Sequence, residues 1–174
     1  MIEVGIPFSD PMADGPVIQD AATKALRNGM TLRLLFEQLS DIRRDVKMPL
    51  VFMGYLNPIY QYGFDAFFKK CSEVGIDGVI IPDLPFNDYL SQVKPVADKY
   101  DVRIIMLITP ETSDERIRFI DDNTDGFIYM VSSAATTGVY TLKIIWHSIK
   151  IFSCFFCNAI CYFVAPRIIC DIRS

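Results

Sequence analysis

The residues best suited to acid–base chemistry lie near the start of the chain. Glu3 stands between Ile2 and Val4 in a short run of strand-forming residues. A carboxylate inside a packed sheet is desolvated unless it is paired, and desolvation raises its pKa toward neutrality. Such a group can both donate and accept a proton near neutral pH, so Glu3 is a candidate general acid and base. Two alternatives are that Glu3 faces a Lys or Arg, or that it lies in a frayed N-terminus.

Two more carboxylates, Asp10 and Asp14, follow in the segment 5–16, which contains three prolines and two glycines. A stiff loop directly after a strand is where βα-barrels keep their catalytic groups. Asp14 and Asp10 are therefore candidate site residues. Asp and Gly are also the residues that ordinary turns use, and this reading remains open.

Other polar residues follow later strand-like runs. Asn57 and Asp83 stand just after two of these runs, and either could simply cap the next helix. Tyr129 ends another run, ahead of the small-residue segment 132–138, which is suited to close over a ligand. A solvated linker would have a similar composition.

Metal and histidine chemistry have little support in the sequence. His147 is the sole histidine and has no partner nearby in sequence, so a Ser/His/Asp site has almost no support. Cys154, Cys157 and Cys161 have the spacing of one helical face, but a fourth ligand at suitable spacing is not evident. We therefore expect no metal site.

Five short apolar runs predict the strands that must position the carboxylates. They are residues 2–6, 50–54, 78–82, 103–108 and 127–131. Each is apolar enough to be buried on both faces, and amphipathic stretches separate them, which is typical of βα units around a parallel sheet. The spacing suits a barrel or an open doubly wound sheet equally well.

Two of the intervening helices have recognisable ends. Thr31 is placed to cap a helix over 32–44. The segment 64–74 has its apolar residues at helical spacing and stops before Gly75, a residue suited to the left-handed conformation. Cys71 falls on the apolar face of this helix, which predicts a core position.

Two further helices carry local signals. Thr112 and Glu115 have the spacing of a capping box. Pro95 lies inside the apparent helix 88–100, which predicts a kink or a late start.

Length, charge and composition limit the function classes. The length of 174 residues is enough for one ordinary domain with a real core, but a complete βα-barrel has about 250. The net charge is −4 and the basic residues are scattered, so we expect no nucleic-acid partner. No apolar leader follows Met1, and the uncharged stretch 151–164 is too short for a span, so we expect a cytoplasmic protein without a membrane partner.

Together these residues resemble the tryptophan synthase alpha chain family. The run E-x-G-x-P-F-S-D-P-x-A-D-G-P at 3–16 resembles the most specific motif of that family, and it continues through Gln19. Further similar segments are 53–58, 78–85 and 129–138. The resemblance implies an α/β fold of TIM (βα)₈ type and a lyase that cleaves indole-3-glycerol phosphate to indole and glyceraldehyde 3-phosphate by a retro-aldol reaction.

The resemblance also implies roles for individual residues. Glu3 is the acid and base, Asp14 accepts the indole N–H and stabilises positive charge on the ring, and Tyr129 lies near the glutamate. Glu3 and Asp14 are then expected to face one cavity. The residues implied beside the substrate are Tyr55, Thr137 and Gly138. Those implied to dock on the tryptophan synthase beta subunit are Asp10, Pro11 and Asn57. Pyridoxal phosphate is expected in that subunit, and no cofactor in this chain.

The chain departs from the family at both ends. The family has a βα unit before the strand of Glu3 and more units beyond Gly138, so we expect an incomplete barrel of about five parallel strands with helices outside. We expect a partial barrel over 1–138 and a separate apolar, Cys-rich tail over 139–174, whose composition suggests an out-of-frame reading. Impaired activity is expected; the alternatives are an inactive remnant or a non-catalytic module that docks on the beta subunit.

Overall fold

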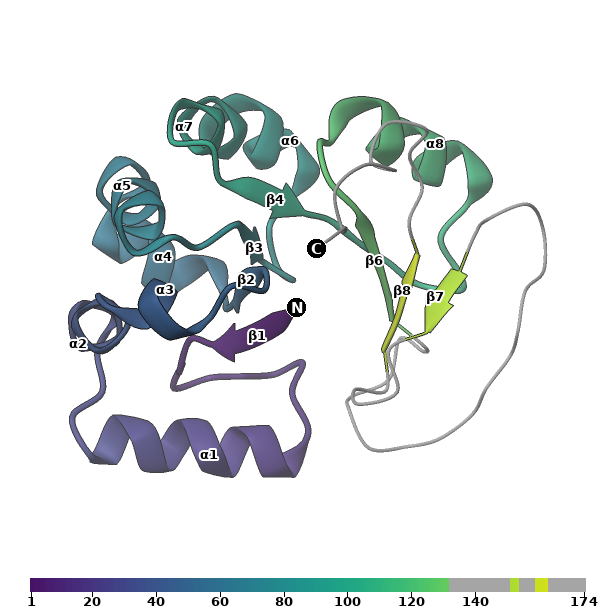
Figure 1. The fold of residues 1–174 in the computed structure, drawn as a ribbon. Coiled ribbons are helices and arrows are strands. Elements are labelled where there is room, and N and C mark those ends of the chain that lie inside the picture. Colours follow the sequence, from purple (N-terminus) through teal and green to yellow (C-terminus); the bar gives the residue numbers. More distant parts are fainter. Residues whose placement is uncertain (132–150, 154–158, 163–174) are drawn as a thin grey trace. The chain divides into compact units, whose positions relative to one another are not determined.

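The computed structural model describes residues 1–131 and the backbone of 151–153 and 159–162 (Figure 1). The chain divides into two compact units, Met1–Ile104 and Ile105–Ser174. The predicted tail over 139–174 lies almost wholly outside the described residues. The two units are described separately below.

The first sheet has the strand order β1-β2-β3-β4. Its strands are β1 Ile2–Gly5, β2 Leu50–Met53, β3 Gly78–Ile80 and β4 Arg103–Ile105. Strand β2 runs parallel to both β1 and β3, and Glu3 is the register partner of Val51. The predicted α/β fold with parallel strands is therefore confirmed.

Helices connect these strands and lie outside them in Figure 1. They are α1 Pro16–Arg27, α2 Leu32–Gln38, α3 Ile42–Asp45, α4 Leu56–Tyr62, α5 Phe64–Val74, α6 Phe86–Asp88, the π-helix Tyr89–Val93 and α7 Lys94–Lys99. The cap predicted at Thr31 is confirmed, since its hydroxyl accepts from the backbone N–H of Leu34 at 3.2 Å. The single helix predicted over 32–44 is wrong, because the chain leaves helical geometry after Gln38 and re-enters it at Ile42.

One aromatic cluster fills the space between the sheet and its helices. The ring of Phe67 lies 5.7 Å from that of Phe36, 6.3 Å from that of Phe52 and 5.2 Å from that of Phe68. All four side chains are buried. Cys71 on the same helix is buried as well, which confirms its predicted core position. Burial in these apolar surroundings raises the pKa of its thiol, so Cys71 is inert packing rather than a nucleophile.

Arg43 ties the amino-terminal ends of β2 and β3 to the end of α5. Its Nε donates to the carbonyl of Gly75 at 2.7 Å, and Nη1 donates to the carbonyl of Met48 at 2.7 Å. Nη2 forms an ion pair with Asp77, whose Oδ2 also accepts from the backbone N–H of Leu50. Gly75 has a φ of +81°, as predicted for a left-handed residue at the end of α5.

The effect predicted for Pro95 is confirmed. Residues Tyr89–Val93 form a π-helix, and α7 begins at Lys94 with Pro95 in its first turn. Proline has no N–H to donate to the carbonyl four residues earlier, and its ring crowds that carbonyl. A π-helical turn accommodates both constraints without ending the helix.

The second unit contains a sheet of order β5-β6-β8-β7. Its strands are β5 Leu107–Ile108, β6 Ile128–Val131, β8 Ala159–Tyr162 and β7 Ile151–Ser153. Strand β5 is parallel to β6, whereas β8 is antiparallel to β6 and to β7. The sequence predicted neither β7 nor β8, and Cys161 lies in β8 rather than on a helix. The one strand predicted over 103–108 is also wrong, because the chain breaks at Met106 and its halves join different sheets.

Helix α8, Asp114–Asn123, begins one residue later than the capping box predicts. Ser113 is the N-cap, and its hydroxyl accepts from the backbone N–H of Arg116 at 3.3 Å. Thr112 instead accepts from the backbone N–H of Thr109 at 2.8 Å. The predicted box at Thr112 and Glu115 is therefore wrong, because the threonine hydroxyl closes the preceding turn.

Candidate active site

Glu3 lies in the middle of β1, and backbone hydrogen bonds hold the chain in place before and after this residue. The backbone N–H of Ile2 donates to Pro49 at 2.8 Å, and that of Ile6 to Met53 at 2.7 Å. A frayed N-terminus therefore does not explain this glutamate. Among the residues that the structure describes, no Lys or Arg forms an ion pair with it, so the pairing alternative has no support either.

The burial predicted for β1 is wrong. Ile2 is 37% exposed and the side chain of Glu3 reaches solvent, because β1 is the edge strand of the described sheet and only β2 lies beside it. Protein atoms still displace enough water around the carboxylate to raise the pKa of Glu3 above its ordinary value. The structure therefore agrees with the predicted rise in the pKa of Glu3, but not with the predicted burial of β1 on both faces.

Asp14 is bound to a tyrosine from the next βα unit. The Tyr55 hydroxyl donates to Oδ2 of Asp14 at 3.2 Å and accepts from the backbone N–H of Ala13 at 3.0 Å. Partial burial raises the pKa of Asp14, and the hydrogen bond from Tyr55 opposes that rise. The pKa of Tyr55 is raised as well, chiefly by burial and in addition by the negative charge of Asp14.

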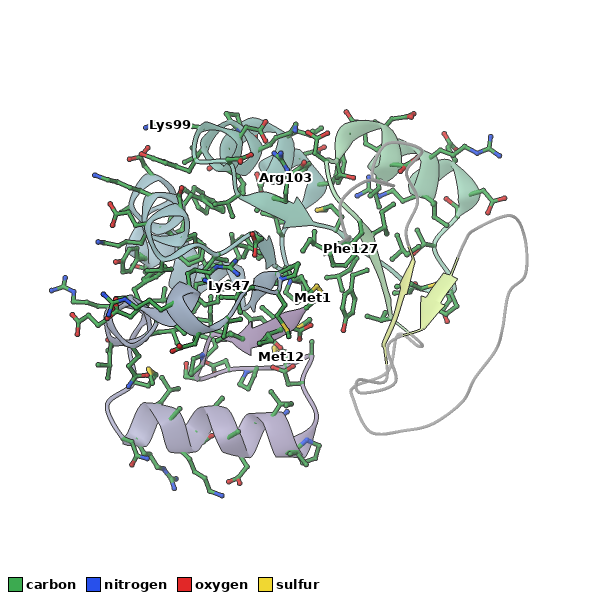
Figure 2. All side chains as sticks on the ribbon, viewed as in Figure 1. Met1, Met12, Lys47, Lys99, Arg103 and Phe127 are labelled. Atoms are coloured by element: carbon green, nitrogen blue, oxygen red, sulfur yellow. The ribbon has the colours of Figure 1, made fainter. Side chains whose placement is uncertain are left out.

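The loop that carries Asp14, marked by Met12 in Figure 2, is also braced from its other end. Nε2 of Gln19 in the second turn of α1 donates to the carbonyl of Asp14 at 2.8 Å. The backbone N–H of Asp14 donates to the carbonyl of Pro11 at 3.1 Å, which closes a turn. Asp14 therefore lies in an ordinary turn and is also a candidate site residue, because the turn holds its carboxylate in place.

The residues expected to meet a partner lie on the surface of the same unit. Asp10 is exposed and accepts from the Ser9 hydroxyl at 2.6 Å, and Pro11 is half-buried. Asn57 is exposed in the first turn of α4. Asp83 does not cap the helix that follows it; it caps α4 instead, since it accepts from the backbone N–H of Leu56 at 2.8 Å.

The remaining predicted residues belong to the second unit or lie outside the described residues. Tyr129 belongs to the second unit, where it is buried in β6 and pairs with Leu107 of β5. Its nearness to Glu3 stays a prediction. Thr137 and Gly138 lie outside the described residues.

An apolar cavity of about 410 Å³ lies behind the loop, between α1, α2 and α4. It is lined by Ile6, Pro7, Phe8, Ser9, Leu26, Met30, Thr31, Leu32, Leu35, Pro58, Gln61 and Tyr62. Neither Glu3 nor Asp14 lines it. The single cavity expected to hold both carboxylates is therefore not this one.

Glu3 gives this unit a pH-dependent stability that can be measured. The pKa of Glu3 is raised in the folded chain above its ordinary value of 4.5. The stabilising contribution of the protonated group is therefore complete below that value and is lost as pH rises through the folded pKa. We expect Glu3→Gln to match the native chain at low pH and to gain stability relative to it as pH rises.

Urea unfolding of both chains between about pH 4 and pH 8 measures this difference in the free energy of unfolding. Glu37→Gln, at an exposed position of α2, is the matched control. A stability difference between Glu3→Gln and the native chain that does not change with pH would contradict the raised pKa.

The part of the chain that the structure describes contains neither a metal site nor a membrane-spanning helix. Within the described part of the chain, no group of three or more His, Cys, Asp or Glu side chains is arranged to hold a metal ion. No helix in that part has both the length and the apolar character needed to cross a bilayer.

Comparison with known proteins decides the family. The sequence model of the "Tryptophan synthase alpha chain" family matches residues 1–144. The chain belongs to the tryptophan synthase alpha chain family. The alpha chain of Bacteroides fragilis is 75% identical over 138 residues, and that of Flavobacterium johnsoniae is 61% identical over 138 residues. The first match covers 79% of this chain and 52% of the relative, and the second covers 79% and 54%.

Solved structures of the tryptophan synthase alpha family agree with this assignment. The alpha subunit of Legionella pneumophila strain Paris superposes with a TM-score of 0.70 at 42% identity, covering 76% of this chain and 50% of that one. A chain of the tryptophan synthase complex of Pyrococcus furiosus gives 0.70 at 41% identity, covering 76% and 54%. These structures confirm the resemblance and the partial TIM barrel. The chain spans about half the length of the curated relatives it matches.

Sequence reasoning missed how Tyr55 is used in this alpha-family chain. The resemblance implied a tyrosine beside the substrate, whereas the structure directs its hydroxyl to Asp14 and Ala13. No local pattern could reveal a contact between residues 41 positions apart. The only sequence signal was that Tyr55 and the loop of Asp14 both follow strands, whose carboxyl ends meet at one edge of a parallel sheet.

Proposed function

We propose that this chain carries the lyase chemistry of its family, the retro-aldol cleavage of indole-3-glycerol phosphate to indole and glyceraldehyde 3-phosphate. The observation that supports the proposal is the pair of carboxylates on β1 and on the loop after it. Burial raises the pKa of Glu3 and of Asp14, and Asp14 has a hydrogen-bond donor in Tyr55 while Glu3 has no ion-pair partner among the described residues. Two carboxylates in different surroundings suit two different tasks.

In this proposal Glu3 handles the protons. A raised pKa enlarges the protonated fraction of Glu3 at a given pH, and in the proposed first step this carboxyl donates a proton to C3 of the indole ring. The resulting carboxylate then accepts the proton of the hydroxyl on the adjacent glyceryl carbon. The carbon–carbon bond breaks, its electrons return to the ring, and the hydroxyl carbon becomes the aldehyde. Glu3 ends the cycle protonated, as it began.

Asp14 stabilises the positive charge that appears between these steps. Protonation at C3 spreads charge to the ring nitrogen, whose N–H then donates to the Asp14 carboxylate. A fixed negative charge at this point favours the charged intermediate over the neutral substrate. This role requires Asp14 to be ionised, and the hydrogen bond from Tyr55 favours the ionised form against the effect of burial.

We further propose that the chain docks on a tryptophan synthase beta subunit through Asp10, Pro11 and Asn57. The exposure of Asp10 and Asn57 supports this assignment. Pyridoxal phosphate would then belong to the beta subunit, this chain would need no cofactor, and both would work in the cytoplasm.

Incubation of the purified chain with indole-3-glycerol phosphate, with and without a beta subunit, tests the proposal. Indole release supports the lyase. Stimulation of the beta reaction without indole release identifies a non-catalytic docking module. A chain that neither releases indole nor binds the beta subunit is an inactive remnant.

A further inference from the structure

We propose that Tyr55 is a positioning residue, which fixes the Asp14 carboxylate and the backbone before it for the reaction, rather than a residue that binds substrate. The inference rests on the proposed function, because Asp14 has a chemical task only in that reaction. It depends on contacts within the first compact unit alone.

One oxygen atom of Tyr55 holds two points of the loop. It accepts from the backbone N–H of Ala13 at 3.0 Å and donates to Oδ2 of Asp14 at 3.2 Å. A phenolic hydroxyl has a single proton to donate, and here that proton is directed at Asp14. The hydroxyl therefore has no second proton to offer a substrate while this arrangement lasts.

Tyr55 is itself held by both neighbouring βα units. Gly54 just before it donates its backbone N–H to Ile80 of β3 at 3.1 Å, and Leu56 just after it donates to Asp83 at 2.8 Å. The Phe8 ring packs against the Tyr55 ring with centroids 5.2 Å apart. A residue fixed at its backbone and its ring can set the position of the loop that it contacts.

The link has a definite chemical consequence for Asp14. Because Tyr55 takes one of the lone pairs of Oδ2, we assign Oδ1 as the oxygen that accepts the indole N–H. The same hydrogen bond stabilises the ionised carboxylate, since a donor favours the charged form of an acid. The raised pKa of Tyr55 keeps the phenol protonated, so it remains a donor over the working range of pH.

Tyr55→Phe separates positioning from binding, because it keeps the ring on Phe8 and removes only the hydroxyl. We expect the pKa of Asp14, measured by carboxyl-carbon NMR without substrate, to rise, since burial remains and the opposing hydrogen bond is lost. We expect kcat for indole release to fall by about tenfold or more with KM little changed, as for a lost charge-assisted hydrogen bond.

Tyr60→Phe is the matched control, because Tyr60 is 61% exposed on α4 and loses the same atom. Neither the pKa of Asp14 nor kcat should change in that variant. An unchanged pKa of Asp14 in Tyr55→Phe overturns the proposal, and so does a higher KM at unchanged kcat, which would identify a substrate contact.

The NMR measurement also keeps the two proposals apart. If the unsubstituted chain releases no indole, the proposed function fails. The pKa of Asp14 in Tyr55→Phe then decides by itself whether Tyr55 controls the carboxylate.

Discussion

Glu3→Gln is expected to lower the rate of indole release from indole-3-glycerol phosphate by about 10²- to 10⁴-fold, the range of general acid–base catalysis. Glutamine keeps the shape and polarity of the side chain, but at neutral pH it neither delivers a proton to carbon nor accepts one from a hydroxyl. The measurement is indole release over time by the variant and by the unsubstituted chain at equal concentration.

The control for this experiment is again Glu37→Gln, which removes an exposed carboxylate from α2 and should leave the rate unchanged. Binding of the substrate should change little in Glu3→Gln, because the lost function is proton transfer. A variant that keeps the native rate would show that Glu3 is not the acid and base, and the proposed mechanism would fall.

Phe67→Ala is expected to lower the free energy of unfolding by about 3–5 kcal/mol, the usual range for removing a fully buried aromatic ring. Phe67 is 0% exposed, and its ring contacts Phe36, Phe52, Phe68 and Tyr62. The rings come from α2, β2, α4 and α5, so a rigid cavity at this point would remove contacts in four elements at once. Urea unfolding followed by circular dichroism gives the value.

Phe119→Ala serves as the control for the loss of a phenylalanine ring. Phe119 is 43% exposed on α8, and we expect its removal to cost about 0.5 kcal/mol or less, as for most surface substitutions. A loss below about 1 kcal/mol for Phe67→Ala would mean that the aromatic cluster relaxes to fill the space and does not hold the sheet to its helices.

The sequence predicted the elements whose signals are local. Thr31 caps α2, Gly75 ends α5 in the left-handed conformation, and Pro95 disturbs the helix around it. Each of these outcomes depends on residues within a few positions of one another. The alternation of strands and helices along the chain also predicts parallel βα units without any distant contact, but it does not decide the strand order.

The predictions that were wrong have two physical causes. Some depend on a choice between nearly equal local partners, and the others depend on distant parts of the chain. Ser113 and Thr112 are both good caps, and only the turn at Thr109 decides between them. The burial of β1 depends on what lies beside its free edge, which composition does not reveal. The break at Met106 separates two sheets, although the local sequence reads as one continuous strand.

For the site, the motif predicted candidate side chains but not how they are connected. Glu3 and Asp14 were identified from their surroundings in sequence, and the raised pKa values agree with that choice. The hydrogen bond from Tyr55 to Asp14 joins residues from two βα units and required coordinates. The relation of Tyr129 to Glu3 stays a prediction, since these residues belong to different units.

Arg43 lies at the end of the first sheet that is opposite to Tyr55 and Asp14. Its planar guanidinium donates to the main-chain oxygens of Gly75 and Met48 and pairs with Asp77 at the amino-terminal ends of β2 and β3, a geometry that the single ammonium of lysine does not reproduce. Tyr55 and Asp14 lie beyond the carboxyl-terminal ends of β2 and β1. Substitutions that stabilise the amino-terminal end of the sheet can therefore be chosen without altering the contacts of Tyr55 and Asp14 at the other end.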